Sequence, residues 1–446
     1  MRFRLTHVLA FMIGVVGGAA LELHAAGTLQ EIYPFPSGNF DPNTLTLTAD
    51  GALYGTTSGG GGYNLGTVFR FTPGVGLVTL INFSGTNGSK PQAALVQGND
   101  GAFYGTTLAG GSYDFGTIFR ITTDGQLTSL ASFTATNGSY PQARLLLASD
   151  SLFYGTTFNG GISNQGTIFR VSTNGAFETL VTFVGTNGAS PAGGLTAGPD
   201  GALYGTTSAG GSTDEGIVFR ITTNGVFTNL VSFAGVKGSV PYSGLTLAND
   251  GYFYGTTYSG GANSLGNVFR VTTNGGLTNL VSFAGSNGSF PQADLMLGSD
   301  GALYSTTYNG GANDNGTVFR VTTDGVITTL GTFYETNGAL PYTSVVATSD
   351  GFIYGTSSDG GSLAGGNIFR ISLFTTCTML PLTKTGPNWN VNLSGTPGSN
   401  FRVVRATSLA GPWTTLTNVT FGVDGLAQCR DTNAPSATAF FRAVNP

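Results

Sequence analysis

The chain has 446 residues, of which 72 are glycine and only 9% are charged, and its formal net charge is −5. This composition favours short strands joined by tight turns over helices, and therefore predicts an all-β protein. The acidic balance leaves no basic patch to neutralise phosphates, which argues against nucleic acid as a partner.

The first 26 residues have the pattern of a cleaved signal peptide. Arg2 and Arg4 precede an apolar stretch at residues 8–21, and the small residues Ala25 and Ala26 follow it. The stretch contains three glycines and is shorter than the roughly 20 residues of a membrane-spanning helix. This disfavours the alternative, an uncleaved membrane anchor. We therefore expect an exported protein, extracellular, at the cell surface or periplasmic, with no membrane span in the mature chain.

Cleavage near Ala26 would remove both histidines, His7 and His24. The mature chain would then offer no histidine to a nucleophilic triad, a general base or a zinc site. We expect no cofactor and no metal site, and the sequence favours a protein that is not an enzyme.

An eight-residue string recurs seven times at a spacing of 50 residues. It reads DGALYGTT at the first copy, and the copies begin at Asp50, Asp100, Asp150, Asp200, Asp250, Asp300 and Asp350. Each copy contains four strand-like runs; in the second, residues 93–97 and 102–107 flank one Asp-Gly turn, and GTIFRIT and LTSLASF flank another. Four antiparallel strands per unit of this length predict a propeller blade.

The two ends of the repeat array are complementary. The last copy stops near Leu373 without a fourth strand, whereas a lone strand-like run, residues 28–35, precedes the first copy. We expect this run to complete the last blade, giving a seven-bladed β-propeller over residues 27–373 with no open sheet edge. A solenoid, the competing architecture, is disfavoured because its coils are much shorter than this repeat.

The copies differ most in the glycine-rich loop between the second and third strands and in the segment that crosses to the next blade. In a propeller both open on one face, where aromatic, amide and carboxylate side chains could bind a glycan. The candidate ligand-binding residues are Tyr63, Tyr113, Asp114, Phe158, Asp214, Tyr258, Tyr308 and Asp314. The alternative is that the aromatic rings only pack against the neighbouring blade.

Asp214 and the adjacent Glu215 form the best acidic cluster for catalysis. Paired carboxylates can cleave glycosidic bonds, although adjacent residues usually point apart. A carbohydrate-active hydrolase or lyase that uses loop carboxylates is therefore the alternative function. The run Asn313–Gly316 hints at calcium but lacks the alternating oxygen ligands and closing glutamate of a calcium loop.

One arginine per repeat follows the phenylalanine of the third strand: Arg70, Arg120, Arg170, Arg220, Arg270, Arg320 and Arg370. Pairing of the second and third strands would put Arg70 roughly opposite Leu53 and within reach of Asp50. We expect an Arg–Asp bond to brace each hairpin, as between Arg120 and Asp100. A ring of anion sites is the alternative.

The 50-residue period ends near Thr375, and residues 374–446 read as a separate unit. Runs such as NWNVNLSG and NFRVVRAT alternate like the strands of a small β-sandwich. The only cysteines, Cys377 and Cys429, lie here. In an exported protein a disulfide between them is expected, with two unpaired buried thiols as the alternative.

The repeat, with its DGxLYGTTxxGG and GTVFR elements, resembles the GloVer tandem-repeat family, also called the choice-of-anchor repeat, over roughly residues 40–372. The resemblance implies a bacterial exported propeller joined to a surface-anchoring or sorting signal, with no defined catalytic residues. This tail has neither an LPxTG-like motif nor a hydrophobic helix with a basic end, and instead looks like fibronectin-type modules. A weaker likeness to streptogramin-lyase-like propellers does not carry their activity, because those enzymes rely on histidine.

These observations support one hypothesis above the others. The chain is expected to be an exported, non-enzymatic binding or structural propeller at the cell exterior. Its loop face would meet a polysaccharide or a surface protein.

Overall fold

The repeated YGTT and FR segments form the two central strands of each unit. In the computed structural model, β3 (Leu53–Thr57) is buried at every position, and β4 (Thr67–Thr72) is buried at Thr67, Val68, Phe69 and Phe71. A strand that is covered on both faces needs such near-continuous burial. The structure describes residues 29–38, 40–349 and 352–372, and then the segments 377–379, 383–385, 388–395, 400–406, 414–420, 426–432 and 440–444.

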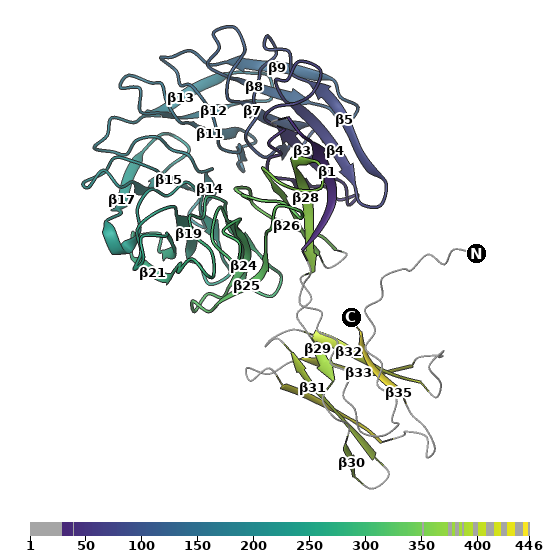
Figure 1. Ribbon diagram of the computed structural model, residues 1–446. Coiled ribbons are helices and arrows are strands. Elements are labelled where there is room, and N and C mark those ends of the chain that lie inside the picture. Colours follow the sequence, from purple (N-terminus) through teal and green to yellow (C-terminus); the bar gives the residue numbers. More distant parts are fainter. Residues whose placement is uncertain are drawn as a thin grey trace. The chain divides into compact units, whose positions relative to one another are not determined.

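Seven four-stranded antiparallel sheets form the blades of a β-propeller (Figure 1). Blade 1 consists of β2 (Thr46–Leu47), β3, β4 and β5 (Gly76–Asn82). Blades 2 to 6 follow in chain order, with four strands each. Blade 2 consists of β6 (Val96–Gln97), β7 (Phe103–Thr107), β8 (Thr117–Ile121) and β9 (Leu127–Ser132), and blade 3 of β10 (Leu146–Leu147), β11 (Phe153–Thr157), β12 (Thr167–Val171) and β13 (Phe177–Thr182). Blade 4 consists of β14 (Thr196–Ala197), β15 (Leu203–Thr207), β16 (Ile217–Ile221) and β17 (Phe227–Ser232), blade 5 of β18 (Thr246–Leu247), β19 (Phe253–Thr257), β20 (Asn267–Val271) and β21 (Leu277–Ser282), and blade 6 of β22 (Met296–Leu297), β23 (Leu303–Thr307), β24 (Thr317–Val321) and β25 (Ile327–Thr332). In the described residues the only helical element is a 3-10 turn, η1 (Gly235–Lys237), and no helix is long and apolar enough to span a membrane.

A glycine in the second strand lets a phenylalanine of the third strand lie across it. Gly55 is paired with Phe69, and a methyl group built on Gly55 would lie 2.5 Å from the Cζ atom of that ring. Any larger residue would therefore have to displace the ring. Blade 6 departs from this pattern, because Ser305 stands where the other blades have glycine.

Buried rings from neighbouring blades stack on one another. The ring of Tyr54 lies 4.2 Å, centroid to centroid, from that of Phe103 in blade 2. The equivalent pair between blades 2 and 3, Tyr104 and Phe153, lies at 4.1 Å. Both members of each pair are buried, so every blade depends on its neighbour to cover its apolar face.

Blade 7 combines both ends of the repeat array. Its strands are β26 (Val346–Ala347), β27 (Phe352–Ser357), β28 (Ala364–Ser372) and, on the outside, β1 (Gln30–Pro36), which pairs antiparallel with β28. Phe35 of β1 belongs to a buried cluster with Phe69 and Phe71 of blade 1. The hydroxyl of Thr356 also donates to the carbonyl of Pro42, 3.0 Å away.

The residues described after Ser372 form a second compact unit of two sheets. In one sheet, β31 (Asn388–Gly395) pairs with β29 (Cys377–Met379), β30 (Thr383–Thr385) and β34 (Leu426–Asp431). In the other, β32 (Asn400–Ala406) lies between β33 (Thr414–Thr420) and β35 (Phe440–Val444). The predicted signal peptide lies outside the described residues.

The predicted disulfide between Cys377 and Cys429 is wrong. Cys429 is a free, buried thiol. The strand register explains why, because Cys377 is paired with Gly395 of β31 and Cys429 with Val391 of the same strand. Four residues along a strand span about 13 Å, whereas a disulfide needs Cα atoms within about 7 Å.

We predict that removal of residues 28–35 from the mature chain lowers the melting temperature by roughly 5–10 °C or more. The deletion exposes the edge of β28 and takes the buried Phe35 from its cluster. The measurement is thermal unfolding by circular dichroism, with the full mature chain as the control. An unchanged melting curve would contradict a role for β1 in stabilising the ring.

We predict that Cys429 resists alkylation in the folded protein. Burial, reinforced by the nearby Asp431, raises the pKa of the Cys429 thiol to about 11. The reactive thiolate is therefore scarce at pH 8. Peptide mass spectrometry should find Cys429 carbamidomethylated by iodoacetamide only after denaturation. A cross-linked peptide pair containing Cys377 and Cys429 in a non-reducing digest would overturn the free-thiol assignment.

Candidate functional site

The glycine-rich loop after each second strand contacts the segment that crosses from the previous blade. Ser89 forms a bridge with Ala109, and the amide of Gly111 donates to the carbonyl of Gly85, 2.8 Å away. The loops and the crossings therefore lie on one face of the propeller, called here the loop face.

Each of these loops contains a residue in the left-handed backbone region. In blade 2 this is Asp114 (φ 61°), and its Oδ1 accepts a hydrogen bond from the amide of Gly110 at 2.8 Å. Asparagine and aspartate tolerate this conformation and bond to nearby main chain. The same bond is made by Asn64, Asn164, Asp214 and Asp314. One oxygen of each predicted ligand-binding aspartate is thus used to close its own loop.

Both carboxylates of the predicted acidic cluster hold backbone amides. Asp214 accepts from Gly210 at 2.9 Å, and Glu215 accepts from Gly235 at 2.7 Å. The two side chains therefore fix two different segments. In the described residues no three His, Cys, Asp or Glu side chains gather as a metal site would require.

The predicted aromatic residues divide into two groups. Tyr63 and Tyr113 are 66% and 61% exposed. Tyr258 instead lies between two other rings, with its centroid 5.4 Å from Tyr242 and 5.0 Å from Phe290. Phe158 and Tyr308 are half-buried. Only the first group presents whole rings to solvent.

In the loops after the second strands, the exposed large side chains come from four consecutive blades, whereas the crossings expose Val184, Val236 and Tyr334. Those of the loops are Leu363 of blade 7, Tyr63 of blade 1, Tyr113 of blade 2 and Ile162 of blade 3, and Ile162 is 90% exposed. In blades 4 to 6 the position of Tyr113 carries polar residues whose side chains donate to carbonyls of their own blade. These are Thr213 to Phe233, Asn263 to Phe283 and Asn313 to Phe333. The four exposed residues are called here the loop-face arc.

The third-strand arginines lie one residue away from the predicted register. Arg70 is paired with Tyr54, not Leu53. The guanidinium still reaches the turn, and its Nη2 lies 3.0 Å from Oδ2 of Asp50. The same ion pair joins Arg120 to Asp100, Arg220 to Asp200 and Arg320 to Asp300.

In three blades the predicted Arg–Asp brace is replaced by other contacts. Arg170 donates to Glu178 on the neighbouring strand. The guanidinium of Arg270 lies 4.6 Å from the ring centroid of Tyr252. Arg370 lies over Phe352 and donates to Gln30, while its predicted partner, Asp350, lies outside the described residues. The four bracing blades have alanine after the turn, and the other three have Leu152, Tyr252 and Phe352.

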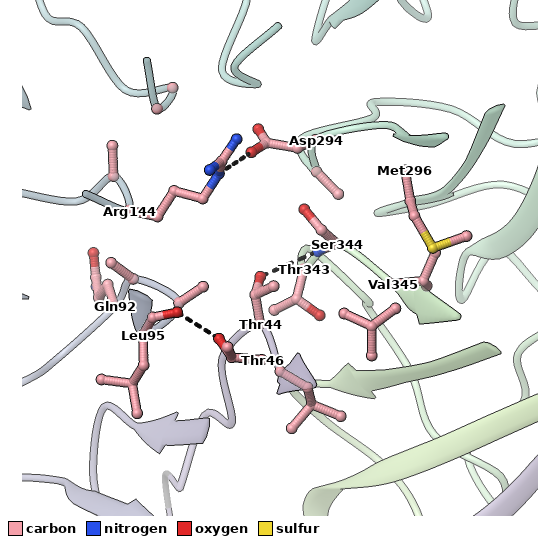
Figure 2. Close-up of a pocket in the computed structure, with 18 of the residues that line it drawn as sticks. Thr44, Thr46, Gln92, Leu95, Arg144, Asp294, Met296, Thr343, Ser344 and Val345 are labelled. Atoms are coloured by element: carbon pink, nitrogen blue, oxygen red, sulfur yellow. Dashed lines mark hydrogen bonds and ion pairs between the residues drawn. The ribbon is translucent and has the colours of Figure 1, made fainter. Parts of the chain in front are cut away.

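A cavity of about 690 Å³ lies where the first-strand segments of the blades meet (Figure 2). Its lining includes Gln92, Arg144, Tyr242, Asp294 and Tyr342, which come from five different blades. Nε of Arg144 lies 3.4 Å from Oδ2 of Asp294. The sequence reasoning missed this cavity, called here the central channel. The sequence feature that could have revealed the channel is that the residue directly after the repeated proline differs from blade to blade.

Seven blades built on one 50-residue repeat define the protein as a tandem-repeat β-propeller. The sequence profile of the Gloeobacter/Verrucomicrobia repeat matches residues 41–249 and 230–393, and the chain belongs to this family. The predicted family resemblance is thereby confirmed. No curated protein matches the chain in sequence.

The chain is similar to several solved structures. The chain is similar to the BP39L lectin from Burkholderia pseudomallei at 9% identity, with a TM-score of 0.53 over 78% of this chain and 96% of that one. It is also similar to a putative 6-phosphogluconolactonase from Bacteroides uniformis ATCC 8492 at 17% identity, with a TM-score of 0.49 over 85% of this chain and 98% of that one. At such identities the likeness concerns the fold alone.

We predict that the Arg320–Asp300 brace stabilises the fold more than the more exposed Arg70–Asp50 brace. The side chains of Arg320 and Asp300 are 13% and 33% exposed, against 38% and 56% for the other pair. Arg320→Ala should therefore cost about 1–3 kcal/mol of unfolding free energy, and Arg70→Ala about 0–1 kcal/mol. Denaturant unfolding of the two variants measures the difference.

The cost of Arg320→Ala should also depend on pH. Burial tends to raise the pKa of Asp300, but hydrogen bonds from Arg320 and Tyr304 outweigh it and hold that pKa below its usual 3.8. A carboxylate whose folded pKa is lowered stabilises the fold above its unfolded pKa and loses this effect as pH falls through the folded value. The difference between wild type and variant should be full at pH 7 and shrink below about pH 4. A difference that grows on acidification would contradict this.

Proposed function

We propose that this chain is an exported, non-enzymatic binding module that holds a polysaccharide on its loop face. The observation that carries the proposal is the loop-face arc. Each of these four blades exposes one large apolar side chain on the same face, and exposed apolar surface on one face is where binding sites are found when it is extensive. Tyrosine combines a broad apolar face with a hydroxyl, which suits a sugar ring and its hydroxyl groups.

The loop geometry supports a binding surface over a flexible one. Tyr113 directly precedes Asp114, whose side chain closes the loop onto Gly110. Tyr63 directly precedes Asn64, which makes the same bond to Gly60. A ring held on a closed loop loses little conformational entropy when it binds a ligand.

Similar sites on successive blades favour a polymeric ligand. Each exposed ring alone would give a weak contact. A polysaccharide that touches two or more blades gains from the high effective concentration of the second site once the first is bound. Because the same loop occurs once in every repeat, such sites lie on consecutive blades.

The alternative, a hydrolase or lyase that uses loop carboxylates, receives less support. Asp214 and Glu215 each accept a backbone hydrogen bond from a different segment. Glycoside cleavage needs two carboxyl groups that face one bond across roughly 5–10 Å. A protein partner is the second candidate, favoured by Ile162 and Leu363, whose aliphatic side chains suit a protein surface better than a sugar.

We also propose a role for each end of the chain. Residues 1–26 would direct export, and β1 would seal the ring at blade 7. The two C-terminal sheets would form a fibronectin-like sandwich. Edman sequencing of the protein recovered from an expressing bacterium tests export, because an N-terminus at Gly27 is expected and one at Met1 would contradict it.

We predict that the double variant Tyr63→Ala/Tyr113→Ala binds polysaccharide about tenfold or more weakly than wild type, because it loses both exposed rings. The measurement is a glycan array of the mature protein, followed by titration of the best polysaccharide into each variant. The matched control is Thr213→Ala/Asn263→Ala, which changes the same loop position in blades 4 and 5 and should retain binding. Full binding by a folded Tyr63/Tyr113 variant would refute the assignment of the arc.

A further inference from the structure

The central channel breaks the sevenfold repeat at one position. Three residues after the repeated proline of blades 2 to 7, and at the equivalent position of blade 1, five blades carry small residues: Thr44, Ala94, Gly194, Gly244 and Ser344. Blade 3 carries Arg144 there, and blade 6 carries Asp294. The two charged residues are 150 positions, or three repeats, apart and meet inside the cavity (Figure 2).

The neighbouring main chain makes room for this pair. A methyl group built on Gly194 would lie 3.0 Å from Cγ of Arg144, so the arginine chain passes close over this glycine. The amide of Gly244 donates to Oδ1 of Asp294 at 2.6 Å. The glycines of blades 4 and 5 thus provide both the space and an anchor for the charged side chains.

A second departure from the repeat fixes the backbone of Asp294. Ser305 replaces the second-strand glycine of the other six blades. Its hydroxyl donates to the carbonyl of Asp294 at 3.0 Å. Blade 6 therefore differs from the other blades at two positions that meet at one point of the channel wall.

The pair leaves hydrogen-bonding groups free for a ligand. The contact between Arg144 and Asp294 is a single long one, 3.4 Å from Nε to Oδ2. Among the described residues no acceptor is bonded to the terminal nitrogens of Arg144, whose side chain is 35% exposed. Asp294, 22% exposed, uses one oxygen for Gly244 and retains free lone pairs. Donors and acceptors for a third partner are therefore side by side.

The rest of the channel defines the chemistry of that partner. Arg144 and Asp294 are the only charged residues of the lining, and their charges cancel. The lining also carries amides and phenol rings at Gln92, Gln142, Gln292, Tyr242 and Tyr342. Small-molecule sites combine apolar walls with a few convergent polar groups in this way. An uncharged ligand with many hydroxyl groups matches the lining better than an anion or a cation.

We propose that the central channel binds a neutral sugar unit, with Arg144 donating to and Asp294 accepting from its hydroxyl groups. A charged hydrogen bond in such a site contributes more than a neutral one. The cavity of about 690 Å³ is large enough for one or two sugar rings. This site is separate from the loop-face arc and does not depend on the function proposed for it.

The test uses the mature chain and a panel of free methyl glycosides of glucose, galactose, mannose, N-acetylglucosamine, xylose and rhamnose, with glucuronate and glucosamine as charged counterparts. Saturation-transfer NMR identifies the ligand, and calorimetric titration measures its affinity. Arg144→Gln and Asp294→Asn should each weaken binding about tenfold or more. Asp100→Asn, a matched change in a brace outside the channel, should leave the affinity unchanged.

Melting temperatures separate loss of binding from loss of fold. If either charge variant unfolds, Ser344→Leu provides an independent test, because it narrows the channel at the same level while both charged residues remain, and it should also abolish binding. The Tyr63→Ala/Tyr113→Ala variant should keep sugar binding in the channel, so the two proposals can fail separately. Absence of binding by any neutral sugar, binding of charged sugars alone, or unchanged affinity in folded channel variants would overturn the proposal.

Discussion

Each blade of this propeller is apolar on both faces, and every other feature of the ring depends on that constraint. Tyr54 is covered only because Phe103 of the next blade stacks on it at 4.2 Å. At the seam the same need is met by Phe35, which joins the buried cluster of blade 1. A blade without two neighbours would leave such rings in water, so the repeat frame has little freedom to change. The glycine beneath Phe69 is one example, since a methyl group there would meet the ring at 2.5 Å.

Two regions do not have to pack against another blade, because one faces solvent and the other faces the central channel. The loops after the second strands need only a left-handed residue and its bond to a glycine amide, as in Asp114. The residue before it can then vary from tyrosine to asparagine. In the segment before the first strand of blade 3, Leu145 is buried, whereas the adjacent Arg144 lines the cavity. Residues in both regions can vary without disturbing the packing between blades, so both regions can determine which ligand is bound.

The sequence predicted the blade number and the strand order because the period is strict and most of the turns are Asp-Gly or Asn-Gly. The predicted strand register of Arg70 was wrong by one residue, because the sequence of a glycine-rich loop does not show at which residue strand pairing resumes. The exceptions to the Arg–Asp brace had a signal that was overlooked: aromatic residues follow the turn at Tyr252 and Phe352 and attract the guanidinium. The disulfide prediction was wrong because two cysteines in one sheet can be paired with residues several positions apart along the strand between them. The channel was missed because its residues become neighbours only when the ring brings together positions 150 residues apart.

The loop face and the channel meet at blade 5. Tyr258, a loop residue, lies 5.4 Å from Tyr242 of the channel lining and 5.0 Å from Phe290 of the next crossing. Its ring is thus part of the wall between the two regions, and its removal would loosen both at once. Tyr63 and Tyr113, in contrast, are more than half exposed, and neither lines the channel. A binding loss caused by changing Tyr258 would therefore not reveal which region holds the ligand, whereas a loss caused by changing the two exposed tyrosines belongs to the loop face alone.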